Sequence, residues 1–283
     1  MWLNRLWKVR KAAPSTMVRA RIGYLADGSS RPRADRIQPE RSLVPFEDRE
    51  LPIHDMRYAA DPASLSDEGF TLVRHESRVA DFTDAAEVEK VYLAEVEELV
   101  RQASGATRVF ALPRPVLRSS RHTPDATGMI TEVPAPIAHT DFTDRSIQAA
   151  AATALERAGA TGAGTDRFTI YTVWRSLRPP PQDRPLALCD IRTVAMTDLV
   201  RADAVGNPGS AEVESEFYLL KANSRHRWCY YSAMTPDEAL IFRQSDSLSG
   251  EPSGCPHTSF IHPESQGAVP RLSIEARACV FLD

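Results

Sequence analysis

The segment 271–278 near the C-terminus alternates strictly between polar and apolar residues, which predicts a β-strand with two unlike faces. One face carries Arg271, Ser273, Glu275 and Arg277. The other face carries Leu272, Ile274, Ala276 and Ala278. Two interpretations fit this strand: an edge strand whose polar face meets solvent, or a strand whose polar face lines a barrel interior and binds an anion. In the second case, the apolar face packs against a covering helix such as 84–103.

The remaining pattern is mainly β. Runs rich in β-branched and aromatic residues, most of them separated by Pro, Gly, Asn or Asp, predict strands near 108–112, 167–174, 216–220, 227–232, 238–242 and 273–281. Apolar residues at helical spacing, with a start at Asp84 and a stop at Gly105, predict a helix over 84–103. A second helix is expected over about 144–158. Helices combined with many short strands indicate an α+β fold in which a barrel or sandwich carries the site.

The length of 283 residues suits one large domain. Residues 25–50 are rich in Arg, Pro, Ser and Asp, so we expect an N-terminal arm and first strand over 1–50 and one domain over 51–283. The net charge of −4 gives no sign of a nucleic-acid partner, and no apolar run reaches the about 20 residues of a membrane span. Four scattered cysteines without a Cys-x-x-Cys pair predict free thiols in a reducing compartment, and we expect the cytoplasm.

His139-Thr-Asp141 is the first candidate for a metal site. Residues two apart on a strand point to the same face, so these side chains can take two adjacent positions around one metal ion. A facial triad of two histidines and one carboxylate needs a second histidine from farther along the chain. Three histidines follow, and we rank His257 first, His262 second and His226 third, because His257 comes shortly after the acidic turn and apolar strand 237–242.

Arg271 and Ser273 are the candidate anion site. They share one strand face, and a guanidinium with a neighbouring hydroxyl can hold a carboxylate. Arg277, on the same face, is the alternative anchor. Within the sequence we find no Gly-x-Ser-x-Gly elbow, no P-loop and no dinucleotide-binding glycine motif. The sequence therefore does not favour a hydrolase or a nucleotide-binding protein.

Several stretches together resemble the CmcJ-like group, which includes cephem-methoxylation proteins and fungal gibberellin-desaturase-like and hydroxylase/desaturase-like enzymes. The resemblance covers about residues 18–282 and is carried mainly by Tyr171–Arg175, Pro185–Asp190, His226–Trp228, Met234–Phe242, His257–Phe260 and Arg271–Arg277. The chain departs from the family pattern at Leu272, Ala276 and His262. These departures leave the metal assignment standing and bring in His262 as a candidate substrate contact.

The resemblance implies a double-stranded β-helix, of the jelly-roll or cupin-like kind, with flanking helices and an oxygenase domain over 51–283. It implies iron(II), 2-oxoglutarate and dioxygen, used for hydroxylation, desaturation or oxidative ring formation on a small molecule of secondary metabolism. Carried onto this chain, the metal ligands and catalytic residues would be His139, Asp141 and His257. Arg271 would anchor 2-oxoglutarate, with Ser273 beside it.

The substrate pocket is less well defined by the sequence. Candidate contacts, each of which could equally be plain core or a structural ion pair, are Trp174, Arg175, His226, Tyr230, Phe260 and His262. Two rival functions stay open: an iron oxidase without 2-oxoglutarate, in which Arg271 and Ser273 bind the substrate's own carboxylate, and a non-catalytic cupin-like binding protein. A homodimer or an accessory subunit would be the protein partner to test.

Overall fold

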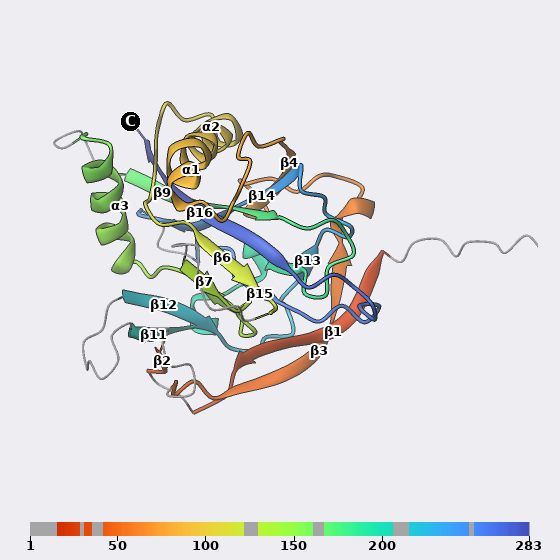
Figure 1. Ribbon diagram of the computed structural model, residues 1–283. Coiled ribbons are helices and arrows are strands. Elements are labelled where there is room, and N and C mark those ends of the chain that lie inside the picture. The colour runs from red at the N-terminus through yellow and green to blue at the C-terminus, as the bar shows by residue number, and fades with distance from the viewer. Residues whose placement is uncertain are drawn as a thin grey trace, which may run out of the picture.

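The computed structural model describes residues 16–28, 31–35, 42–121, 130–160, 167–205, 215–248 and 252–282. Two curled sheets face each other across these ranges (Figure 1). The first sheet has the order β1 (Met17–Leu25), β3 (Phe46–Asp55), β13 (Trp228–Tyr230), β10 (Leu186–Cys189), β15 (His257–Ser259), β8 (His139–Thr140), β12 (Ser215–Leu220), β11 (Leu199–Val205) and β2 (Arg33–Asp35). The second has the order β4 (Phe70–Arg74), β14 (Glu238–Asp246), β9 (Arg167–Ser176), β16 (Leu272–Leu282), β6 (Val116–Ser119) and β7 (Ile130–Glu132), and β5 (Arg108–Ala111) also pairs with β16.

Strand β16 lies in the middle of the second sheet. It pairs with β9 along one side and with β6 and β5 along the other, so it is not an edge strand. Ser273 and Glu275 on its polar face are 1% and 4% exposed. Ile274 and Ala276 on its apolar face belong to a core cluster with Val96 of the neighbouring helix. The barrel-interior interpretation of the alternation is therefore confirmed, and the solvent-exposed edge interpretation is wrong.

The helices cover two different parts of the second sheet. The predicted helix 84–103 consists of α1 (Ala85–Glu87), a π-helical stretch Val88–Tyr92 and α2 (Leu93–Ser104). Asp84 caps its start by accepting hydrogen bonds from two backbone N–H groups, and Gly105 ends it with a φ of 71°. α2 covers the outer face of the sheet, whereas α3 (Ser146–Arg157) packs on the inner-face residues Phe168 and Phe281 and closes one end of the barrel (Figure 1).

The N-terminal strands are part of the first sheet. β1 and β3 form an antiparallel pair, and β3 pairs in parallel with β13. Ile22 and Ile53 pack with Trp228 in a core cluster on the side of this sheet away from the second sheet. The Pro- and Ser-rich composition of residues 25–50 is typical of an irregular arm, but 33–35 form β2 and 46–50 are the first residues of β3, with mostly exposed side chains. Residues 1–15 of the predicted arm lie outside the described ranges, and the domain boundary at residue 50 stays a prediction.

Short 3-10 helices at Met56–Tyr58, Ile191–Thr193 and Met196–Asp198 complete the described elements. Among the described residues, none of the helices has the length and apolar character that crossing a bilayer requires.

Candidate active site

His139, Asp141 and His257 meet on the inner face of the first sheet. His139 on β8 and His257 on β15 are register partners in the antiparallel pair, and Asp141 follows β8 directly. The imidazole Nε2 atoms of His139 and His257 lie 3.6 and 3.8 Å from Oδ1 of Asp141. One ligand atom from each residue falls within 4.8 Å of the others, the arrangement expected for a single metal ion held on one face.

Both histidines are oriented by backbone carbonyl groups. Nδ1 of His139 lies 2.8 Å from the carbonyl oxygen of Ile137, and Nδ1 of His257 lies 3.3 Å from that of Cys255. Because a carbonyl oxygen only accepts, each Nδ1 carries the proton and each Nε2 presents a lone pair. Burial, together with the neighbouring His139, lowers the pKa of His257 to about 4, so this imidazole is neutral at pH 7.

Asp141 is held through its other carboxylate oxygen. Oδ2 accepts hydrogen bonds from Nε of Arg277 at 2.8 Å and from Nε2 of Gln244 at 2.9 Å, and Nη2 of Arg277 lies 2.7 Å away. Burial alone would favour the neutral acid, but the charge of Arg277 and the contacts with the histidines outweigh it and hold the pKa of Asp141 well below its usual value. The donor set is therefore two imidazole nitrogens and one carboxylate, which suits iron(II).

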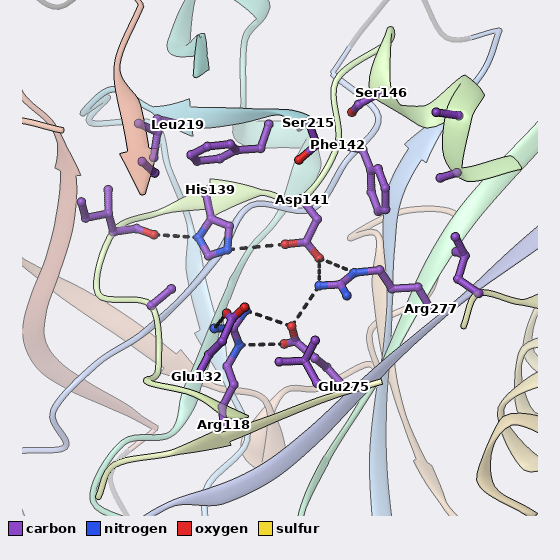
Figure 2. Close-up of a pocket in the computed structure, with 18 of the residues that line it drawn as sticks. Arg118, Glu132, His139, Asp141, Phe142, Ser146, Ser215, Leu219, Glu275 and Arg277 are labelled. Atoms are coloured by element: carbon purple, nitrogen blue, oxygen red, sulfur yellow. Dashed lines mark hydrogen bonds and ion pairs between the residues drawn. The ribbon is translucent and has the colours of Figure 1, made fainter. Parts of the chain in front are cut away.

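A chain of alternating charges runs from this carboxylate across the barrel (Figure 2). Arg277 also donates to Glu275 at 2.9 Å, and Arg118 on β6 donates to the same Glu275 carboxylate at 2.9 and 3.1 Å. Arg118 in turn contacts Glu132 at 2.7 Å. Burial opposes the charge on Glu275, but the two guanidinium groups prevail and lower its pKa to about 2. Each carboxylate in this chain is therefore paired with a guanidinium group.

A cavity of about 480 Å³ opens above the triad, within the usual size range of small-molecule sites. His139 and Asp141 line it together with the charge chain, and α3 contributes Ala149 and Ala150. Its other apolar walls include Val44, Leu112, Val116, Ile137, Phe142, Phe217 and Leu219. The ring of Phe217 stands edge-on to His139 at 6.5 Å between centroids, so the apolar wall reaches the metal-ligand position.

Arg271 is 2% exposed and lies outside the lining of the cavity. Its guanidinium donates to Ser273 Oγ at 2.9 Å and to the backbone oxygen of Arg184 at 3.3 Å, and it lies 5.0 Å from the ring centre of Trp174. Among the described residues, no carboxylate lies within ion-pairing distance of it. The indole N–H of Trp174 is buried, and it has no hydrogen-bond partner within the part of the chain that the structure describes. A buried cation beside an unused N–H donor fits the distal carboxylate of 2-oxoglutarate.

The six predicted substrate residues lie outside the lining of this cavity. Trp174 faces the barrel interior, but Arg175, the next residue, points to the opposite face and contacts His75 and the backbone of Pro236. His226 lies between Tyr24 and Asp198. Outside the cavity lining, an aromatic cluster with centroid distances of 5.4–6.2 Å holds Tyr230, Phe260 and His262.

Sequence reasoning missed several residues of the site. Arg118, Glu132, Gln244 and Phe217 were not singled out, although each lines the cavity or contacts Asp141. Gln244 could have been found, because it lies two residues after Phe242 on a strand and shares its inward face. Arg118 carries no such signal, since its partner Glu275 is 157 residues away.

A β-barrel with two histidines and one carboxylate on its inner face is the architecture of non-haem iron oxygenases. A family model described as an oxidoreductase/YMDC permease-like domain matches residues 23–281. The chain belongs to this family, and the hydroxylase/desaturase resemblance predicted from its motifs is confirmed.

Named relatives and solved structures agree with this assignment. The chain is 32% identical over 248 residues to the hydroxylase/desaturase efuI of Hormonema carpetanum, covering 81% of this chain and 82% of the relative. It is 28% identical over 281 residues to the alpha-ketoglutarate-dependent dioxygenase phiK of a fungal species, covering 95% and 97%. A structure of the iron and alpha-ketoglutarate-dependent endoperoxidase NvfI matches with a TM-score of 0.80 and 25% identity, covering 94% of this chain and 98% of that chain. The predicted double-stranded β-helix is thereby confirmed.

Proposed function

We propose that this chain is an iron(II)- and 2-oxoglutarate-dependent oxygenase that oxidises a C–H bond of a small secondary metabolite, by hydroxylation, desaturation or oxidative ring formation. The observation that carries the proposal is the convergence of His139, Asp141 and His257 within 4.8 Å. In this assignment the two Nε2 atoms and Oδ1 of Asp141 hold the iron. Relatives named as dioxygenases or hydroxylase/desaturases support it over the whole domain.

The co-substrate assignment rests on Arg271. Its buried guanidinium pairs with the distal carboxylate of 2-oxoglutarate, and the free N–H of Trp174 supplies a further hydrogen bond. Ser273 orients the guanidinium through its contact with Nε. When bound, iron and 2-oxoglutarate with dioxygen supply the oxidising chemistry. Arg277 is engaged with Asp141 and Glu275, so we assign the anchor to Arg271 and not to Arg277.

The cavity walls define the substrate class that we propose. Its charged side chains are paired with one another, and the remaining wall is largely apolar, so the favoured substrate is a neutral and mainly apolar molecule. Phe217 and Phe142 would hold it against the metal and exclude water. Matched pairs of a carboxylic acid and its methyl ester test this: the ester should perturb the optical spectrum of the iron complex at lower concentration. Preference for the acid would contradict a neutral-substrate pocket.

An anaerobic optical titration tests the function itself. Iron(II) and then 2-oxoglutarate are added to the metal-free wild type, His257→Ala and the control His262→Ala. A visible charge-transfer band that needs both additions is expected in the wild type and in His262→Ala, and no band is expected in His257→Ala. Bound iron without a band in the wild type would favour the rival oxidase that uses the substrate's own carboxylate. A tight small-molecule complex without oxygen consumption would favour the non-catalytic binding protein.

The proposal also covers the subunit composition of the metal centre and the cellular compartment. All three metal-ligand side chains come from this one chain, which supports a metal centre held within one subunit. The four cysteines are buried and free, which supports the cytoplasm as a reducing compartment.

A further inference from the structure

We propose that Gln244 and Arg277 are positioning residues that make Asp141 a one-oxygen ligand of the iron. Both donate to Oδ2, and both come from the second sheet, whereas the triad lies on the first sheet. The proposal rests on the iron site assigned above. The new point is that residues of the second sheet set how many oxygens of Asp141 are available to the metal.

The two carboxylate oxygens of Asp141 have different partners. Oδ2 is approached by three nitrogen atoms: Nε and Nη2 of Arg277 at 2.8 and 2.7 Å and Nε2 of Gln244 at 2.9 Å. A carboxylate oxygen has two lone pairs, so these donors occupy Oδ2 fully. Oδ1 faces the Nε2 atoms of His139 and His257 at 3.6 and 3.8 Å. A metal ion held by the two histidines would therefore meet Oδ1 of Asp141.

Gln244 also fixes the backbone of the ligand. Its Oε1 accepts a hydrogen bond from the backbone N–H of Asp141 at 3.0 Å, while its Nε2 donates to Oδ2 and to Thr172 Oγ1 at 2.9 Å. The side chain is 1% exposed, and all these contacts lie in the protein interior. One amide thus holds both the main chain and the side chain of Asp141, which fixes the carboxylate torsion.

The guanidinium of Arg277 is held against Asp141 by a second carboxylate, that of Glu275. Glu275 holds Nη2 at 2.9 Å, and Arg118 holds Glu275 through two hydrogen bonds. Thr172, the partner of Gln244, is the register neighbour of Arg277 on β9. Strands β14, β9 and β16 therefore act together on one oxygen atom of a residue in the opposite sheet.

This arrangement has a chemical consequence. A carboxylate that binds through both oxygens fills two coordination positions, whereas one that binds through a single oxygen fills one. With two histidines and one oxygen of Asp141 as its ligands, the metal would keep coordination positions for a co-substrate that binds through two atoms and for dioxygen. Without the restraint, Asp141 can rotate and present Oδ2 as well, which removes a position that 2-oxoglutarate needs.

Cobalt(II) titrations of the metal-free protein test the inference, because the visible bands of cobalt(II) report coordination number. The variants are Gln244→Met, which keeps the side-chain volume, and Arg277→Lys, which keeps the charge. The matched control is Asn223→Leu, since Asn223 donates an amide to another carboxylate, that of Asp198, on the far side of the first sheet. We expect both site variants to bind cobalt(II) roughly 10- to 100-fold more weakly, with changed band positions, while the control matches the wild type.

The outcomes separate this inference from the proposed function. A wild type that binds cobalt(II) and gives the iron–2-oxoglutarate band, with a Gln244→Met variant of unchanged cobalt affinity and spectrum, would overturn the inference and leave the function standing. A wild type that binds no metal would overturn both. If Arg277→Lys does not fold, as shown by its urea unfolding curve, Gln244→Met alone decides, because it removes no charge.

Discussion

Replacing Arg271 by methionine is predicted to weaken 2-oxoglutarate binding without destabilising the ligand-free protein. The guanidinium is 2% exposed and has Ser273 Oγ and one backbone oxygen as hydrogen-bond acceptors. Burial, together with repulsion from Arg118, lowers the pKa of Arg271 to about 9. Methionine has a similar length, so it fills the space and removes only the charge and the donors.

The sign and size of the effect follow from this environment. A folded-state pKa below the unfolded value means that the charged form is disfavoured by folding, so at pH 7 the charge costs a few kcal/mol. The two lost hydrogen bonds cost about 1 kcal/mol each, so the stability of ligand-free Arg271→Met should equal or exceed that of the wild type. The loss of a buried charge-assisted pair with 2-oxoglutarate should cost about 3 kcal/mol, or roughly 150-fold in affinity.

Urea unfolding and anaerobic 2-oxoglutarate titration of the iron-loaded protein measure the two effects. Arg175→Met is the matched control: Arg175 is equally buried, but it lies on the other face of the sheet and donates to the backbone oxygens of His75 and Pro236. The control should lose about 2 kcal/mol of stability and bind 2-oxoglutarate normally. Wild-type 2-oxoglutarate affinity in Arg271→Met would refute the anchor assignment.

Three further variants test the barrel interior. Glu275 has a pKa lowered to about 2, so its charge stabilises the fold above about pH 4.5, and this contribution disappears as the pH falls towards 2. The difference in unfolding free energy between wild type and Glu275→Gln, about 3 kcal/mol at pH 7, should therefore shrink over that range in urea titrations. A constant difference would contradict the charge chain. Ile274→Ala removes a fully buried side chain beneath α2 and should lower the free energy of unfolding by about 2–5 kcal/mol, while the affinity for cobalt(II) stays unchanged. Loss of metal binding would argue against a purely structural role of Ile274. Gly254→Ala places a Cβ 2.2 Å from the backbone oxygen of Gln244, so calorimetry should show a lower melting temperature; an unchanged value would mean that the backbone adapts freely.

The sequence predicted those parts of the fold whose signal is local. The alternation over 271–278 identified the barrel-lining strand, and helical spacing identified the helix that covers it. His139 and Asp141 could be predicted because residues two apart on a strand share a face. His257 was preferred over His262 because it comes shortly after the acidic turn and apolar strand 237–242. Whether the polar face was buried or exposed depended on neighbouring strands more than 90 residues away, which no local pattern contains.

The alternation of side chains along a strand explains why Arg175 and Tyr230 face away from the barrel interior. A shift of one residue along a strand moves a side chain to the other face. Trp174 faces the barrel interior and Arg175 does not; on β13, Cys229 faces it and Tyr230 does not. The aromatic character of a residue does not predict which face of the sheet its side chain takes, because both faces of the first sheet carry packed cores.

The most direct test of these assignments is a crystal structure of the anaerobic complex with iron(II) and 2-oxoglutarate. We predict iron bound to Nε2 of His139 and His257 and to Oδ1 alone of Asp141. We also predict the distal carboxylate of 2-oxoglutarate within hydrogen-bond distance of Arg271. Iron on a set that includes His262, or a distal carboxylate seated elsewhere in the barrel, would contradict them.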